Sequence, residues 1–146
     1  MLTKSSKHAI RAVMYLVKNA SFENKIGAKY IAKKLAIPAP FLAKTLQVLA
    51  KKEIITSIKG PKGGFYLTPA NNKKTIYDII NSVDNVNKIE QCYLGQNECN
   101  DRNPCAIHHL YKPFKISLLN NFKTKTIIDF AKDATQQNKL LLEGTE

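Results

Sequence analysis

All three cysteines of the chain lie in one short stretch, and a histidine follows the last of them. Cys92, Cys99, Cys105 and His108 give the spacing C-x6-C-x5-C-x2-H. Thiolate sulfur binds zinc, copper(I) and iron–sulfur clusters, and imidazole readily completes such a ligand shell. Residues that favour turns separate the thiols, namely Gly95, Asn97, Asn100, Asp101, Asn103 and Pro104. Residues 92–108 are therefore expected to form a loop that can wrap one soft metal centre.

Other interpretations of these residues remain open. Structural zinc sites usually place their cysteines two to four residues apart, so these gaps are wide for zinc but compatible with it. Unrelated free cysteines usually lie in cores, whereas these lie among polar turn residues. His109 competes with His108, because it stands four residues after Cys105. Cys105 and His108 could resemble a nucleophile and its base, but no third orienting group is visible, and we expect no enzyme.

The positive charge of the chain is concentrated in its first half. Residues 1–74 contain 15 Lys and Arg against 2 Asp and Glu, which gives a net charge of +13. Residues 75–146 contain 8 against 9, a net charge of −1, and the whole chain carries +12. This asymmetry indicates a module that binds a polyanion, joined to a module for sensing or assembly. Nucleic acid is the favoured partner, although basic surfaces also serve membranes and acidic proteins.

The basic half contains a helix-turn-helix pattern. A first helix is expected over residues 5–20, a second over 28–35 and a third from Pro40 to about Lys52. Pro38 cannot continue a helix, whereas Pro40 suits a first helical turn, where no N–H donor is needed. In this motif the later helix enters the major groove with its N-terminal residues at base edges.

A β-hairpin is predicted directly after this recognition helix. Residues 54–58 and 65–68 are rich in β-branched and aromatic side chains, and the turn at 59–64 contains three glycines and two lysines. A hairpin in this position is the wing of a winged helix. Its basic tip can follow phosphates or probe the minor groove. The turn does not match the phosphate-binding pattern of nucleotide sites.

The second half is predicted to be helical around the cysteine loop. Thr75 and Asp78 resemble the start of a helix that ends near residue 84, and a polar connector follows. A long helix should begin at Cys105, which places Cys105 and His108 on one helical turn. Pro113 should kink or split this helix. Thr126 should cap a last short helix, and residues 135–146 should fray.

The long helix carries many large apolar residues outside the winged domain: Leu110, Tyr111, Phe114, Ile116, Leu118 and Leu119. They are expected to pack against the same helix of a second copy, because most soluble oligomers are two-fold dimers. Burial within the monomer is the alternative. No apolar run approaches the length of a membrane span, and the N-terminus lacks the features of a signal peptide. We therefore expect a cytoplasmic protein with no membrane partner and no small-molecule substrate.

These features together resemble the Rrf-two family of bacterial winged-helix transcriptional regulators, over about residues 1–130. The resemblance rests on four segments: Lys7 to Ile10, Phe41 to Leu49, the wing from Lys59 to Leu67, and Cys105-x-x-His108. It implies a homodimer and a 2Fe-2S or related cluster on the three cysteines. In the iron–sulfur branch of the family, the fourth ligand is a histidine where His108 stands.

The nitric-oxide-sensing branch instead uses a carboxylate near the first helix, where this chain has Lys7 and His8. The chain is therefore more similar to the iron–sulfur branch, although its first cysteine gap is one residue longer. The family often begins the recognition helix with Ser-x-Ser-Tyr-Leu and usually has Arg-Gly in the wing. Here the helix begins Pro38-Ala39-Pro40-Phe41-Leu42 and the wing has Lys59-Gly60, so the operator should differ.

The predicted fold class is mainly α with a small β-hairpin wing, as a winged helix-turn-helix domain plus a long dimerisation helix. The predicted parts are a DNA-binding domain (1–84), a cluster-binding loop (85–104), a dimerisation helix with a short C-terminal helix (105–134) and a flexible tail (135–146). The residues expected at a palindromic operator in double-stranded DNA are Ala39, Phe41, Lys44, Thr45, Gln47, Lys51, Lys59, Gly60, Lys62 and Gly63.

The expected function is a transcriptional regulator whose DNA binding responds to a cluster on Cys92, Cys99, Cys105 and His108. Loss or modification of the cluster would free the loop and shift the population of DNA-competent dimers. One alternative is a regulator that uses zinc or thiol chemistry without a cluster. The other is a basic RNA-binding protein with a structural metal, which would bind single strands or RNA folds.

Overall fold

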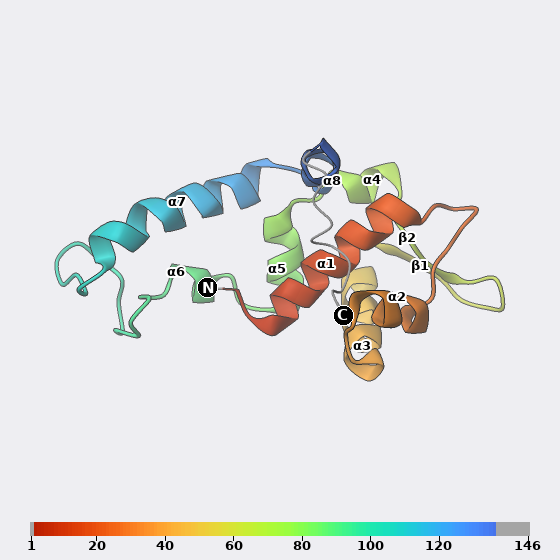
Figure 1. The fold of residues 1–146 in the computed structure, drawn as a ribbon, viewed down its shortest axis with the longest axis horizontal. Helices are drawn as coiled ribbons and strands as arrows, with labels where there is room; N and C mark the ends of the chain where they lie inside the picture. The colour runs from red at the N-terminus through yellow and green to blue at the C-terminus, as the bar shows by residue number, and fades with distance from the viewer. Residues whose placement is uncertain (1, 137–146) are drawn as a thin grey trace.

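The computed structural model describes residues 2–136 and shows a mostly helical chain with one antiparallel β-hairpin (Figure 1). The elements in chain order are α1 (Lys4–Asn19), α2 (Ala28–Leu35), α3 (Ala39–Lys51), β1 (Thr56–Ile58), β2 (Gly64–Tyr66), α4 (Pro69–Asn72), α5 (Ile76–Val83), α6 (Asn87–Glu90), α7 (His108–Thr124) and α8 (Ile127–Gln136). Within residues 2–136, no helix combines the length and apolar character that a membrane span requires.

Helix α1 is the centre of the hydrophobic core. It starts at Thr3, whose hydroxyl oxygen accepts the N–H of Ser6 at 3.2 Å and so satisfies one donor of the first turn. Its fully buried residues are Ala9, Ala12, Val13 and Leu16. Ile10 and Val17 of the same helix are only partly buried against this core. Helices α3, α5 and α8 pack around α1.

The predicted helix-turn-helix is present as α2 and α3. Ala36 ends α2 in the left-handed conformation (φ 53°), and the N–H of Ile37 donates to the Ala32 carbonyl at 3.0 Å. This turn matches the common C-terminal closure of helices. Pro38 precedes the first residue of α3, and Pro40 lies in its first turn, as predicted. The buried side of α3 consists of Leu42, Thr45, Leu46 and Leu49.

The hairpin forms the wing, with Thr56 paired to Tyr66 and Ile58 paired to Gly64. The strands are shorter than predicted, because Ile54 and Ile55 are buried in the core before β1 begins. Two glycines are required at the tip. Gly60 has φ 109°, and a Cβ on Gly63 would lie 2.1 Å from the Ile58 carbonyl oxygen.

The helices that follow the wing start at matching caps. Thr75 and Asp78 form the predicted reciprocal capping box of α5, and Thr126 and Asp129 exchange the same pair of hydrogen bonds at α8. The N–H of Ile127 donates to the Lys74 carbonyl at 2.7 Å, so the starts of α5 and α8 lie side by side. The connector after α5 contains the short helix α6, which the sequence analysis missed.

Helix α7 differs from its prediction in two ways. It begins at His108 rather than Cys105, because the Cys105 carbonyl accepts the His108 N–H in a preceding turn. It also runs unbroken through Pro113, so the predicted split is wrong. Leu119 and Phe122 bury its C-terminal half in the core, and α8 then packs on α1. Of the predicted tail, residues 135 and 136 end α8 and the rest lies outside the described residues.

Asp84 ties the end of α5 to the start of α1. Its carboxylate accepts hydrogen bonds from the Thr3 hydroxyl, from the Lys88 ammonium at 2.8 Å and from the Asn85 N–H. The hydrogen bond from Lys88, followed by that from Thr3, lowers the pKa of Asp84 to about 2. Since the pKa is depressed in the folded state, the ionised carboxylate stabilises the fold above the unfolded pKa near 4.

Replacing Asp84 should therefore weaken the fold in a pH-dependent way. Because Lys88 is half exposed and water screens the pair, we expect Asp84→Asn to lower the free energy of unfolding by about 1 kcal/mol at pH 7. This difference should shrink as the pH falls from 4 towards 2. Urea unfolding at several pH values measures it. Asp133→Asn is the control, because Asp133 forms only an exposed pair with Lys125; equal effects of the two variants would contradict the expectation.

Candidate metal centre and nucleic-acid interface

The cysteine loop joins α6 to α7 at the end of the molecule opposite the wing (Figure 1). Cys92 follows α6 closely and is buried, and Cys105 lies buried just before α7. Cys99 is half-buried in the middle of the loop. The two ends of the loop thus hold two cysteines inside the protein, while the third is partly open to solvent.

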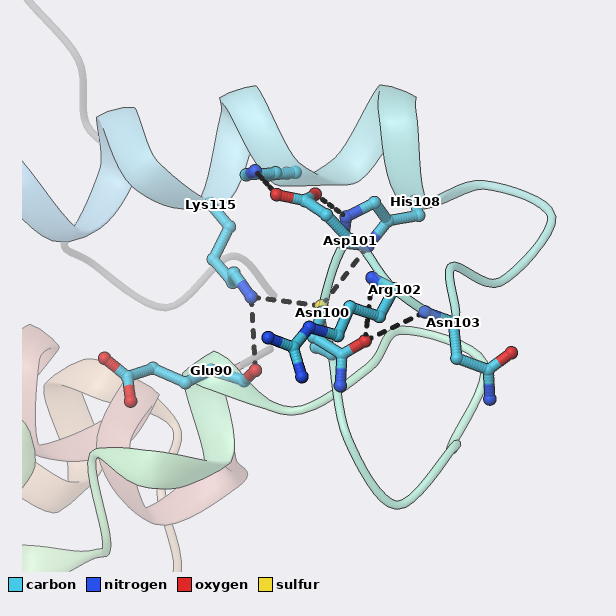
Figure 2. A network of polar contacts seen from close by, with 9 residues as sticks. Glu90, Asn100, Asp101, Arg102, Asn103, His108 and Lys115 are labelled. Carbon is cyan, nitrogen blue, oxygen red and sulfur yellow. Dashed lines mark hydrogen bonds and ion pairs between the residues drawn. The ribbon is translucent and has the colours of Figure 1, made fainter.

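Cys99 and His108 lie together. The Cys99 sulfur is 3.6 Å from His108 Nδ1, and the histidine, the first residue of α7, is only 2% exposed. Asp101 Oδ1 lies 2.8 Å from His108 Nε2 (Figure 2). The ion pair of Asp101 with the Lys112 ammonium at 2.6 Å, followed by its contact with His108, lowers the pKa of this carboxyl to about 2.

This contact determines the orientation of the imidazole. An ionised carboxylate can only accept hydrogen bonds, so His108 Nε2 donates to Asp101 and Nδ1 faces the Cys99 sulfur. Histidines that bind metals usually donate their other ring N–H to a carboxylate or carbonyl in the same way. In the neutral imidazole, Nδ1 then carries a free lone pair that faces the Cys99 sulfur and could bind a metal. His109 is exposed, which favours His108 over its neighbour.

Cys92 and Cys105 form a second sulfur pair. Burial raises the pKa of the Cys92 thiol, but hydrogen bonds from the backbone N–H groups of Gln96 and Leu94, and then from the Cys105 side chain, outweigh it. The pKa of Cys92 is accordingly below its ordinary value. A thiol that loses its proton more easily is a better metal ligand, because the thiolate is the binding form.

The donor set has the composition of a soft metal centre, with three sulfurs and one correctly oriented imidazole. In the described part of the chain, however, no three ligating side chains are grouped closely enough to hold a metal ion. The structure instead brings the candidates together as two pairs, Cys99 with His108 and Cys92 with Cys105. The single centre shared by all four residues stays a prediction.

Two charged residues at this site were missed by the sequence analysis. The sequence pattern indicates Asp101 only as a turn former and gives no role to Lys115. The Lys115 ammonium lies 3.2 Å from the Cys99 sulfur and 3.2 Å from the Glu90 carbonyl oxygen. The spacing of His108 and Lys115 could have indicated this, since residues seven apart lie on one face of a helix.

The exposed side of α3 and the wing that follows it in sequence together form the candidate nucleic-acid surface. Its exposed members are Ala39, Phe41, Lys44, Gln47, Lys51, Lys59, Gly60 and Lys62, and Gly63 is partly exposed. The described ion pairs all involve residues 84–133, so within residues 2–136 these lysines form no ion pair with a carboxylate. They remain available to phosphates.

Thr45 differs from the rest of the predicted set. It is only 7% exposed, and its hydroxyl donates to the Phe41 carbonyl of the preceding turn at 3.0 Å. A buried hydroxyl with an internal partner is not placed to contact a base. Phe41 is 38% exposed and packs edge-on against the His8 ring, with ring centroids 5.3 Å apart. Phe41 therefore offers an apolar contact at the start of the recognition helix.

Solved structures of two transcriptional regulators share this fold. CymR, the global cysteine regulator of B. subtilis, superposes with a TM-score of 0.69 and 19% identity, covering 91% of this chain and 97% of that chain. IscR of T. potens superposes with a TM-score of 0.66 and 19% identity, covering 95% and 91%. The chain thus shares the fold of these two proteins.

Sequence comparison gives the family. The model of the Rrf2 family, described as an iron-dependent transcriptional regulator, matches residues 2–133. A protein of Aquifex aeolicus named as an HTH-type transcriptional regulator is 38% identical over 125 residues, which is 84% of this chain and 85% of the relative. IscR of Pectobacterium carotovorum is 22% identical over 131 residues, 88% of this chain and 79% of the relative. The chain belongs to the Rrf2 family of transcriptional regulators, and its relatives are regulators rather than enzymes.

Removing the carboxylate that orients His108 should weaken metal binding. We expect Asp101→Asn to lower the affinity for cobalt(II), a spectroscopic probe of thiolate sites, by about 10- to 100-fold. Competition with a chelator, followed by the absorption of the cobalt–thiolate bond, measures this affinity. Glu98→Gln is the matched control, because Glu98 is an exposed carboxylate of the same loop whose described contact is with Asn100. Equal affinities of the two variants would argue against an orienting role for Asp101.

Proposed function

We propose that this Rrf2-family regulator binds operator DNA through α3 and the wing, and that an iron–sulfur cluster on Cys92, Cys99, Cys105 and His108 modulates this binding. One observation carries the proposal. The recognition helix at one end presents lysines that have no carboxylate partner in the described part of the chain. At the other end, a histidine is oriented towards a cysteine sulfur. The iron-dependent description of the family supports iron as the metal.

The DNA-binding part follows from the exposed side of α3. Phe41 and Lys44 lie in the N-terminal half of α3, which enters the major groove in this motif, and Gln47 follows one turn later. Lys59 and Lys62 at the wing tip would contact phosphates or the minor groove. Few hydrogen-bonding groups face the bases at the start of α3, which has Pro38, Ala39 and Pro40. Lys44 and Gln47 therefore make most of the hydrogen bonds to base edges.

The cluster-binding part follows from the donor set. When bound, a 2Fe-2S cluster would supply a redox-active centre with a charge that depends on its state. His108 would bind through Nδ1, since Asp101 occupies Nε2. Binding all four residues would require the two pairs to draw together, and this would reorganise the loop between α6 and α7. Zinc is the second candidate, because three cysteines and one histidine also form structural zinc sites.

Regulation would then be a shift between two states of the protein. To convert a population from 1:99 to 99:1, the cluster must favour one state by about 5.5 kcal/mol. A smaller preference suffices for a graded response. We expect the conformational change to lie in the cysteine loop, because Cys99 and its polar neighbours are only partly buried.

We further propose that the working unit is a homodimer on a palindromic operator. Leu110, Phe114 and Ile116 of α7 are 80%, 51% and 47% exposed, although the C-terminal half of the same helix is buried in the core. Large apolar side chains on one exposed helix indicate an interface. Residues 1–84 would bind DNA, 85–104 would hold the cluster and 105–134 would dimerise. A regulator of this kind acts in the cytoplasm, where the DNA is.

Replacement of the wing lysines should change the salt dependence of DNA binding. A protein that binds phosphates releases counterions, so the logarithm of affinity falls linearly with the logarithm of salt concentration. We expect Lys59→Ala and Lys62→Ala each to reduce this slope by about 1, because each removes one lysine from a phosphate. Fluorescence anisotropy with a labelled duplex measures the slope. Lys132→Ala, an exposed lysine on α8, should leave it unchanged. An unaltered slope in both wing variants would remove the wing from the interface.

The metal centre is tested by purification without oxygen, followed by an absorption spectrum and assays of iron, sulfide and zinc on one sample. Visible absorption with equal amounts of iron and sulfide supports the cluster, and His108→Ala should then weaken cluster retention at least about tenfold. His109→Ala is the control, since His109 is exposed and lies beside the site. A colourless protein with stoichiometric zinc would exclude the cluster mechanism and support the zinc alternative.

A further inference from the structure

Lys115 is a buried cation with no carboxylate partner among residues 2–136. Its side chain is only 9% exposed, and lysine is almost never this buried unless it is paired. The four ion pairs among the described residues do not include it. A buried ammonium that lacks a carboxylate needs other acceptors, because an unpaired buried charge is strongly destabilising.

The two acceptors of Lys115 come from separate segments of the chain. One is the Cys99 sulfur in the middle of the cysteine loop, at 3.2 Å, and the other is the Glu90 main-chain carbonyl at the end of α6, also at 3.2 Å. Figure 2 shows the side chain leaving α7 and reaching both. Its ammonium also lies 5.8 Å from the Tyr111 ring centroid, a cation–π contact that favours the same position.

A purely structural explanation accounts poorly for this arrangement. If only packing mattered here, an apolar side chain of similar volume would stabilise the protein at least as well as a buried charge. Among the described residues, the one side chain that accepts a hydrogen bond from the Lys115 ammonium is Cys99, whose sulfur is also a candidate metal ligand. The arrangement therefore connects the cation to the chemistry of the sulfur.

We propose that Lys115 is a positioning residue that holds Cys99 against the end of α6 and donates a hydrogen bond to its sulfur. It does not bind metal itself. Because α6 follows α5 directly, and Asp84 ties the end of α5 to α1, Lys115 connects the cysteine loop to the helices of the DNA-binding domain. Its effect on a cluster rests on the proposed function, whereas its effect on the loop does not.

The ammonium should also influence a cluster electronically. Hydrogen bonds and positive charge at a ligand sulfur favour the state of the cluster that carries more negative charge, which is the reduced state. Lys115 should thus raise the reduction potential. Removing the charge should change the ratio of oxidised to reduced cluster at a fixed potential about tenfold, a shift of about 59 mV to more negative potential for one electron.

The first measurement uses protein without metal. Lys115→Met keeps the length of the side chain and removes the charge, and amide hydrogen exchange of residues 91–104 should become about tenfold faster, since the protein then lacks a hydrogen bond from a charged group. Lys115→Arg keeps the charge, so its exchange rates in residues 91–104 should stay close to those of the natural protein. Lys123→Met is the control, because it removes an equal charge from α7 far from the loop. Circular dichroism checks the fold, and Lys115→Gln replaces Lys115→Met if the latter does not fold.

The second measurement is a redox titration of the same variants after cluster assembly. A more negative potential in Lys115→Met, with Lys115→Arg close to the natural protein, supports the proposal and cannot come from loss of rigidity alone. Unchanged hydrogen exchange in Lys115→Met would overturn the positioning role whether or not a cluster binds. Equal potentials in Lys115→Met and Lys115→Arg would overturn the electronic role. Faster exchange in Lys115→Met, in a protein that takes up no iron or sulfide, would support the positioning role of Lys115 and refute the proposed cluster.

Discussion

The burial of α1 is the constraint on which the rest of the structure depends. Ala9 and Ala12 let neighbouring helices approach closely, while Val13 and Leu16 fill the space between them. Helix α3 packs on one part of α1. The lysines of α3 and its Phe41 remain exposed to solvent. Helix α5 packs on another part and leads directly to the cysteine loop. A change that displaced α1 would therefore disturb the recognition helix and the base of the candidate metal centre together.

The two candidate sites lie at opposite ends of the molecule, so the proposed coupling between them would pass through packed helices (Figure 1). Two connections lead out of the cysteine loop. One runs through α6 and α5 to the start of α1, fixed by the hydrogen bonds of Asp84. The other runs along α7, whose Leu119 and Phe122 enter the core. Both connections consist of packed side chains and hydrogen bonds, the kinds of contact that can carry coupling between distant sites.

Much of the fold could be predicted, because its strongest signals are local. The capping box of Thr75 and Asp78, the prolines around α3 and the glycines of the wing each act within a few residues. The site was harder to predict, because its contacts are long-range. The pairing of Cys92 with Cys105 and the reach of Lys115 to the Glu90 carbonyl depend on how distant segments fold together. The burial of Thr45 was also hard to foresee, because its position on the helix, rather than its residue type, decides it.

The packing of the last described helix on the first has a consequence for how the protein is made. Domains usually fold from the N-terminus during synthesis, at a rate set by the ribosome. Here the side of α1 that contacts α8 stays uncovered until residues 127–136 have emerged, by which time the whole cysteine loop has been translated. The nascent chain cannot complete its DNA-binding core before its thiols are exposed to the surroundings.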